Sequence, residues 1–289
     1  MSKTRFSEIS ESLVVSGHKL YFRRYRHLDH QGPARRLLLL HGAGVAGRDT
    51  WGALHPFLVG WSDILVPDFR GTGDSVSFDG QEHPFTINDL VNDVHQILDA
   101  VHWESFDLSG YSLGGLVAML LKQQMKDRVH KQFLIESALL DRPDWQETVA
   151  IRKAYSAATH ALRDSGSESG IMQFLDIISP NRKLNPATEK LTVARLGARA
   201  TGFANALDAV TQACFHIDRE PLLAAQGDVS SFIGGLSVDP VHHLHRHLSE
   251  RLSNWHYFLV KGTDHSLPFQ KPRQIARLMN DELVRFLSQ

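Results

Sequence analysis

The sequence predicts an α/β fold in which a mostly parallel sheet is covered by helices on both faces and carries an all-helical insertion. Short β-rich runs alternate with helical patterns in the two terminal parts of the chain, as is typical of parallel sheets. Residues 37–40 are all leucine, as expected of a strand buried on both faces. Residues 138–225 contain successive helical segments without a clear strand. We therefore expect a core domain of residues 1–137 and 226–289, interrupted by a helical insertion of residues 138–225.

The elements of the first half follow from local patterns. Gly17-His18 separates two β-rich runs and predicts a hairpin. Thr86 is the expected N-cap of a helix whose apolar residues recur at helical spacing as far as Val101. Strands are predicted at 13–16, 20–25, 37–40, 64–66, 106–108 and 133–135, and a second helix at 116–125.

The second half contains the insertion and then resumes the alternation. Asn185-Pro186 predicts a helix start, since proline is favoured at the first helical position. After the insertion we expect a strand at 231–234, a helix at 241–252, a strand at 255–260 and a final amphipathic helix.

Composition excludes several classes of protein. The 289 residues are 42% hydrophobic and 22% charged, which is ordinary for a globular chain and argues against disorder. A net charge of −1 gives no electrostatic reason to expect nucleic acid or an anionic membrane as partner. Cys214 is the only cysteine, so neither an intramolecular disulfide nor a CxxC site is possible. The charged N-terminal segment and the lack of any apolar run near about 18 residues predict a cytoplasmic protein.

The pentapeptide Gly110-Tyr111-Ser112-Leu113-Gly114 carries the main chemical signal. It has the pattern G-x-S-x-G and lies between a predicted strand and a predicted helix. A serine at the tip of so tight a turn is strained, and glycines on either side let the backbones approach. The N-terminus of the following helix directs free N–H groups toward an anion forming there. We therefore take Ser112 as a candidate nucleophile; the alternative is an ordinary turn with an inert serine.

His265 is the candidate base among 17 histidines. It lies directly after the last predicted strand, in a loop at the sheet edge from which a side chain can reach Ser112. A surface loop histidine is the alternative. Four histidines at 242, 243, 245 and 247 form a sequence cluster, but they lie on a predicted amphipathic helix without carboxylate or cysteine support. No metal is expected.

Two carboxylates compete for the role of the acid that orients the imidazole. Asp239 lies between a predicted strand and helix and gives the chain order Ser, Asp, His, so it is the first choice. Glu136 follows the strand at 133–135 and is the alternative acid, or else a strand-end carboxylate paired with an arginine. Asp228 and Asp264 are less well placed, one before its strand and the other beside the histidine itself.

An oxyanion requires two preorganised N–H donors. Leu113, the residue after the candidate nucleophile, is expected to supply one of them. The loop after residues 37–40 is expected to supply the other, from Ala43. His41 is interpreted as structural, fixing that loop by hydrogen bonds.

Four motifs in order resemble those of the α/β-hydrolase superfamily: His41-Gly42-Ala43-Gly44, DFRGTGDS at 68–75, GYSLGG at 110–115 and Gly262-Thr263-Asp264-His265. The resemblance spans nearly the whole chain and implies an eight-stranded, mostly parallel sheet with helices on both faces (the α/β-hydrolase fold). It implies that 138–225 is a helical cap or lid over the site. It also implies Ser112 as nucleophile, His265 as base, and Ala43 and Leu113 as the oxyanion hole.

One departure from the family pattern concerns the acid. Members that resemble this chain usually place it three residues after a glycine that ends the seventh strand. Here Gly235 puts Val238 at that position, one residue short of Asp239, and Gly227 puts Ser230 there. Either the loop has one extra residue or the acid has moved to Glu136, as in some haloalkane-dehalogenase-like relatives.

The predicted activity is cleavage of a carboxylic ester, or a related acyl bond, of a small apolar substrate without a cofactor. Carbon–carbon bond hydrolysis, thioester cleavage and cofactor-free perhydrolysis are alternatives on the same residues. A serine at 112 argues against dehalogenation and epoxide opening, because the relatives that perform these reactions use aspartate there. Trp145, Tyr155, Ile171, Met172, Phe174, Leu175 and Phe203 are candidate pocket residues, although most of them are expected only to pack the cap.

Two other readings come from different classes of protein. Residues 42–47 form a G-x-G-x-x-G pattern after a strand, and Asp68 follows 21 residues after Gly47, as in dinucleotide-binding oxidoreductases. That reading explains neither Ser112 nor His265. A non-catalytic ligand receptor with the same fold is the other alternative.

Overall fold

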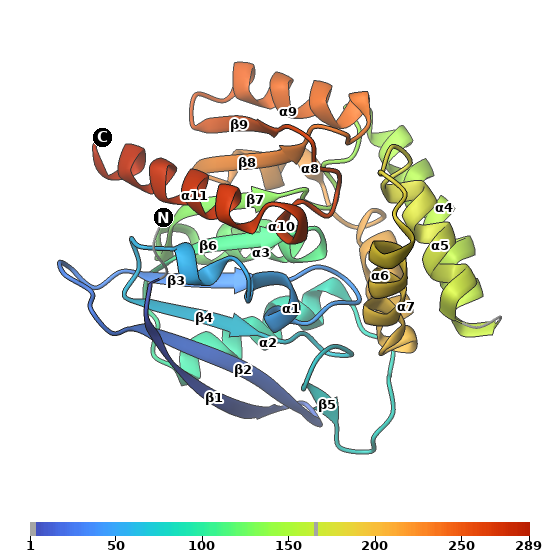
Figure 1. Ribbon diagram of the computed structural model, residues 1–289, viewed down its shortest axis with the longest axis horizontal. Helices are drawn as coiled ribbons and strands as arrows, with labels where there is room; N and C mark the ends of the chain where they lie inside the picture. The colour runs from blue at the N-terminus through green and yellow to red at the C-terminus, as the bar shows by residue number, and fades with distance from the viewer. Residues whose placement is uncertain (1–3, 165–166) are drawn as a thin grey trace.

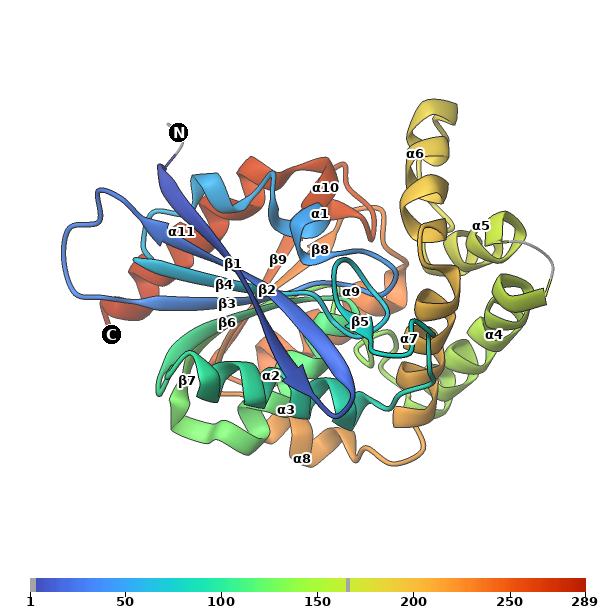
Figure 2. The same cartoon turned by 90° about the horizontal axis from the view of Figure 1, so that it is seen from below.

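The computed structural model describes residues 4–164 and 167–289 and has three layers, a central sheet between two layers of helices (Figures 1 and 2). The strands are β1 (Phe6–Val15), β2 (His18–His27), β3 (Arg36–Leu40), β4 (Asp63–Pro67), β5 (Val76–Ser77), β6 (Phe106–Tyr111), β7 (Val129–Ile135), β8 (Asp228–Gly234) and β9 (Trp255–Val260). The helices are α1 (Gly47–Trp51), α2 (Ile87–Ala100), α3 (Leu113–Met125), α4 (Trp145–Asp164), α5 (Ser167–Ile178), α6 (Pro186–Gly197), α7 (Ala200–Ala213), α8 (Arg219–Ala224), α9 (Asp239–Arg251), α10 (Leu267–Gln270) and α11 (Pro272–Leu287).

The sheet has the order β1-β2-β4-β3-β6-β7-β8-β9, with β5 paired to β2. All pairs from β4 to β9 are parallel, whereas β2 pairs antiparallel with β1, β4 and β5. The predicted mostly parallel α/β sheet is confirmed, with nine strands rather than eight. The additional strand is the two-residue β5.

The elements expected from local patterns are present, and most are longer than predicted. The hairpin turn falls at Ser16-Gly17, one residue earlier than Gly17-His18, and both turn residues have positive φ. Thr86 caps α2 in a reciprocal box with Asp89. Asn185 caps α6 by accepting from two backbone N–H groups.

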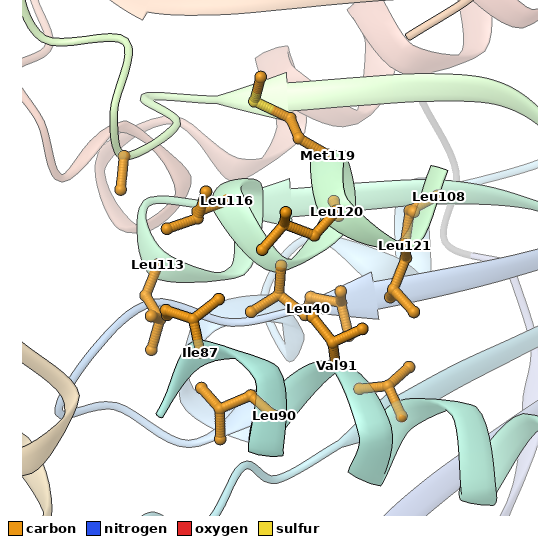
Figure 3. Close-up of a cluster of buried hydrophobic side chains, with 14 of the residues drawn as sticks. Leu40, Ile87, Leu90, Val91, Leu108, Leu113, Leu116, Met119, Leu120 and Leu121 are labelled. Carbon is orange, nitrogen blue, oxygen red and sulfur yellow. The ribbon is translucent and has the colours of Figure 1, made fainter. Parts of the chain in front are cut away.

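Helices α2, α3 and α8 cover one face of the sheet, and α1 and α11 cover the other (Figure 2). The first face is filled by apolar side chains of α2, α3 and the buried strands, as Figure 3 shows for Leu40, Ile87, Val91, Leu116 and Leu120. These side chains are almost fully buried, and burial of each contributes about 1.5–3 kcal/mol to folding. This packing fixes α3, whose N-terminus forms the site described below.

Helices α4, α5, α6 and α7 group beyond the carboxyl ends of the parallel strands (Figure 1). They lie within the predicted insertion of residues 138–225, whose exact boundaries stay a prediction. Its last helix, α8, packs on α3, and Leu222 and Leu223 join the core cluster. Within the described residues, no helix combines the length and the apolar character that a membrane crossing requires.

A contact between two glycines and an ion pair help to join these helices to the core. Arg199, which precedes α7, donates from Nε to Glu82 at 2.6 Å and from Nη1 to the carbonyl of Ser75 at 2.6 Å. Gly202 of α7 lies directly against Gly71, so close that a Cβ on Gly202 would clash with the Gly71 backbone. At this point α7 can approach the core so closely because both residues lack a side chain.

Gly202→Ala is expected to destabilise the protein by about 1–3 kcal/mol. The new Cβ would clash with the Gly71 backbone, so one of the two chain segments would have to shift. Gly197→Ala is the matched control in α6, where the nearest atom is the mobile Ser167 hydroxyl at 3.2 Å. Calorimetric unfolding of both variants checks this. An unchanged Gly202→Ala midpoint would show that the two segments do not approach as described.

Candidate active site

Ser112 lies at the turn between β6 and α3, with φ 52° and ψ −115°. This left-handed backbone conformation is costly for a residue with a Cβ. The turn closes because Gly110 and Gly114 flank it: a Cβ on Gly110 would clash with the Gly114 carbonyl, and one on Gly114 with the carbonyl of Leu40. The G-x-S-x-G pattern thus holds the partly exposed serine at the carboxyl edge of the sheet.

His265 lies in the loop after β9, and its Nε2 is 3.2 Å from Ser112 Oγ. The loop is held by Asp264, which accepts from the Ser266 N–H at 2.8 Å and from the Gln270 amide at 2.8 Å. The structure therefore brings together the two residues predicted as nucleophile and base, 153 positions apart in the chain.

Glu136 is the carboxylate beside the imidazole. Its Oε2 is 3.3 Å from His265 Nδ1, and its Oε1 accepts from the Gly234 N–H at 2.7 Å and the Ser237 hydroxyl at 2.6 Å. A proton on Nδ1 directed at the carboxylate leaves Nε2 free to accept the Ser112 hydroxyl proton. The three side chains thus form a continuous hydrogen-bonded chain.

Burial alone would raise the pKa of Glu136, but the effect of its hydrogen-bond donors prevails. The imidazole of His265, the Ser237 hydroxyl and the Gly234 N–H hold the pKa of Glu136 below its usual range. The carboxylate is therefore ionised at neutral pH, in a position where it can stabilise a protonated imidazole.

Asp239, the first choice for the acid, does not lie beside His265. It is exposed and is the first residue of α9, which begins two residues earlier than the predicted position 241. A carboxylate in the first helical turn is favoured by the helix dipole, which gives Asp239 a sufficient structural reason. The geometry instead favours Glu136, the alternative acid.

The loop after β8 still serves the acid position, although it does not supply the carboxylate. Gly234 ends β8 and Ser237 follows it, and both donate to Glu136. Sequence reasoning missed these two donors. The spacing of the loop after β8 could have indicated that the loop does not supply the acid, because the position three residues after Gly235 is not a carboxylate. Asp228, also considered, is the first residue of β8 and pairs with Arg285 at 2.7 Å and with Lys131.

The two expected oxyanion donors lie on the segments that meet at Ser112. Leu113 is the first residue of α3, so its N–H has no partner within the helix. Ala43 follows β3, where a Cβ on Gly42 would approach Ser112 Cβ to 3.4 Å. His41 holds this loop: its Nε2 accepts from the Phe69 N–H at 2.9 Å, and its Nδ1 lies 2.8 Å from the Gly42 carbonyl.

A cavity of about 480 Å³ opens at these residues, with Ser112, His265, Ala43 and Leu113 in its wall. Cap helices α4, α5, α6 and α7 supply much of the remaining wall. Of the seven candidate pocket residues, Phe174 and Leu175 line this cavity. Others pack inside the cap, as expected for most of them; Ile171 and Phe203 are fully buried there.

The rival motifs have structural explanations. Asp68 is buried and accepts from the N–H groups of Gly47 at 2.8 Å and Asp74 at 3.1 Å, and it pairs with Arg23 at 3.2 Å. Its oxygens therefore hold the loop together and are not free for a ribose, so the dinucleotide reading is not supported.

The histidine cluster divides between two sides of α9. His242 and His245 are buried and lie 2.7 Å from the hydroxyls of Tyr257 and Ser231, whereas His243 and His247 are exposed. Among the residues that the structure describes, no group of three or more His, Cys, Asp or Glu side chains is arranged to hold a metal ion.

Comparisons with known proteins agree with this architecture. A family described as "Alpha/beta hydrolase family" matches residues 37–278. Pyrrolizixenacetamide deacetylase of Xenorhabdus hominickii is 29% identical over 42% of this chain and 44% of its own length. Soluble epoxide hydrolase of Corynebacterium sp. strain C12 is 27% identical over 43% of each chain. This chain thus spans less than half the length of either relative.

Solved structures are similar over nearly the whole chain. A carboxylesterase structure from the thaumarchaeon Nitrososphaera gargenis has a TM-score of 0.73 at 16% identity and covers 96% of this chain and 99% of its own. MenH from S. aureus has a TM-score of 0.73 at 16% identity and covers 94% and 100%. At this identity the likeness shows the fold.

The strain at Ser112 has a measurable consequence. Ser112→Gly is expected to be more stable than Ser112→Ala by about 1–2 kcal/mol. Glycine adopts a positive φ without a steric penalty, whereas alanine has a Cβ and retains that penalty. Thermal unfolding of the two variants compares them directly, since both lack the hydroxyl. Equal midpoints would contradict a strained turn at this position.

Proposed function

The chain belongs to the alpha/beta hydrolase family, and from this premise we propose that it is a serine hydrolase that cleaves a carboxylic ester, or a related acyl bond, of a small apolar substrate. The observation that carries the proposal is the hydrogen-bonded chain from Ser112 through His265 to Glu136, which opens onto the cavity. A serine hydroxyl is a weak nucleophile until a base removes its proton, and this arrangement provides that base.

In the proposed reaction, Ser112 Oγ attacks the substrate carbonyl while His265 Nε2 takes the hydroxyl proton. The tetrahedral intermediate collapses when the imidazolium gives that proton to the leaving alcohol, and an acyl-serine remains. Water then attacks the acyl group with the same histidine as base, which releases the acid and regenerates Ser112. Glu136 stays ionised throughout and stabilises the imidazolium.

The oxyanion of each tetrahedral intermediate is proposed to bind the N–H groups of Ala43 and Leu113. Both residues line the cavity beside Ser112, and the Leu113 N–H points out of the helix terminus. Two such preorganised donors are worth about 2.7–4 kcal/mol each in related sites.

The cavity supports a substrate with an apolar body. Phe174, Leu175, Leu196 and Leu207 lie in its wall. The name of the Xenorhabdus relative, a deacetylase, supports acyl transfer to water as the reaction class. Carbon–carbon bond, thioester and perhydrolase activities on the same residues, and a non-catalytic receptor, are the rival functions that the following experiment separates.

Ser112→Ala should abolish hydrolysis of p-nitrophenyl esters from acetate to decanoate and should remove any pre-steady-state burst. The variant should lose all activity because the serine hydroxyl is the only atom proposed to form the acyl-enzyme, whereas the wild type should turn over at least one ester. Stopped-flow absorbance measures both burst and steady rate.

Ser109→Ala is the matched control, since Ser109 lies on β6, the strand that leads to Ser112, is fully buried and has no hydrogen-bond partner for its hydroxyl among the described residues. It should retain the wild-type rate within about twofold. Ester hydrolysis by Ser112→Ala would exclude Ser112 as the nucleophile. A wild type that hydrolyses no ester would favour a receptor or one of the other bonds.

Glu136→Gln should lower kcat by about 10⁴-fold, because an amide stabilises neither the imidazolium nor the required tautomer. Asp239→Asn removes an exposed carboxylate and should leave kcat within about twofold. Steady-state kinetics on the best p-nitrophenyl ester decide between them. The opposite ranking would return the role to Asp239.

A further inference from the structure

Arg152 is a buried charged side chain in the cavity wall that the proposed hydrolysis does not use. Arg152 of α4 is only 5% exposed, yet it lines the same cavity as Ser112. Its Nε is buried and has no hydrogen-bond partner among the residues that the structure describes. An unsatisfied buried donor costs about 1–3 kcal/mol, and more when it carries charge. Arg152 Nε therefore requires a hydrogen-bond acceptor that the described residues do not supply.

The partners that Arg152 does have leave most of its donors free. Its Nη2 donates to Asp141, the single hydrogen bond between these two side chains, and its guanidinium carbon lies 5.2 Å from the centre of the Tyr155 ring. A guanidinium presents five N–H donors in a planar fork that matches a carboxylate at two points. Asp141 accepts from only one of these donors, on Nη2.

A purely structural ion pair is the competing explanation. Asp141 lies in the segment between β7 and α4, and Arg152 lies in α4, so their contact holds α4 against the segment that leads into it from the core. Such a pair has no need to face a cavity, and a two-point contact would leave fewer donors unsatisfied. The observed pair leaves the buried Nε without a partner among the described residues, in a residue that lines the cavity of the candidate nucleophile.

The other charged groups in the wall do not provide the missing acceptor. Asp264 accepts from the Ser266 N–H and the Gln270 amide, and Glu189 Oε1 lies 3.5 Å from Arg182 Nε in an ion pair without a hydrogen bond among the described residues. Asp49, the third carboxylate of the wall, is exposed. The cations Arg182, Lys183 and Arg195 also line the cavity, so with Arg152 the wall has four cations against these three carboxylates.

We propose that Arg152, buried in the wall of the cavity shared with Ser112, binds a carboxylate on the substrate and so selects esters that carry a second, ionised acid group. The inference rests on the proposed function, which it narrows to monoanionic esters with an apolar body. Arg152 acts in specificity: it touches the far end of the substrate and not the reacting carbonyl.

Two matched substrate pairs test it, one with the charge on the leaving group and one with the charge on the acyl group. They are 4-acetoxybenzoate against methyl 4-acetoxybenzoate, and monomethyl against dimethyl adipate. In at least one pair, Arg152→Met should lower the ratio of kcat/KM for the anionic to the neutral ester by about 10- to 100-fold, the range for a hydrogen bond to a charged group. The neutral ester reports any general loss of folding.

Two control variants separate charge from structure. Lys153→Met removes the same charge from the next position of α4, where the side chain is exposed. Asp141→Asn breaks the ion pair but keeps Arg152. Both should keep the ratio within about threefold. The proposal is overturned if Arg152→Met leaves both ratios unchanged, or if Asp141→Asn lowers them as much as Arg152→Met does.

A binding measurement keeps this inference distinct from the proposed function. Calorimetric titration of 4-acetoxybenzoate and of monomethyl adipate into Ser112→Ala should give, for at least one of them, a Kd that rises about tenfold or more when Arg152→Met is added. If that result holds while the wild type hydrolyses no ester, the carboxylate site stands and ester hydrolysis fails. If the wild type hydrolyses esters but neither Kd depends on Arg152, the carboxylate site fails alone.

Discussion

The geometry of the site depends on keeping one carboxylate charged inside the protein. Glu136 is buried at the end of β7, where desolvation opposes its ionisation, and only a full set of hydrogen-bond donors makes that position tolerable. Gly234 and Ser237 occupy one oxygen, which leaves the other directed at His265. The imidazole is thereby held with Nε2 toward Ser112. Removing either donor from the loop after β8 would loosen this orientation without touching the histidine.

The backbone is strained at the ends of two adjacent strands, β6 and β7. Ser112 after β6 and Glu136 after β7 both have positive φ, and the Ser112 N–H donates to the Ile135 carbonyl at 2.9 Å. Strain of this kind persists only where the surrounding structure over-determines it. Here the parallel register of β6 with β7 and the buried α3 supply that constraint. The two side chains therefore project from a rigid edge, which suits groups that must meet within a hydrogen-bond length.

The sequence predicts the parts of this site that are locally encoded. Ser112 and His265 follow from short motifs after strands, and most strands and helices follow from apolar periodicity, although β5 is too short to carry a pattern. The acid does not follow, because Asp239 and Glu136 both come after strands and local pattern does not show which of them lies beside the histidine; Asp239 is instead the first residue of α9. Pocket residues are equally non-local: neighbouring positions such as Ile171 and Phe174 differ in whether they face the cap interior or the cavity, and only packing decides that.

Core and cap place different constraints on the cavity. The core fixes the reacting groups through strand ends, glycines and buried donors, so its geometry tolerates little change. The cap is joined to it by close glycine contact at Gly202 and by Arg199 with Glu82. Arg152 of α4 pairs with Asp141 in the segment that leads from β7 into α4, and it also lines the cavity. If Arg152 binds an anion as proposed, that anion would also change the electrostatic balance of the Arg152–Asp141 contact that holds α4, and selection of substrate would then be linked to the position of this helix.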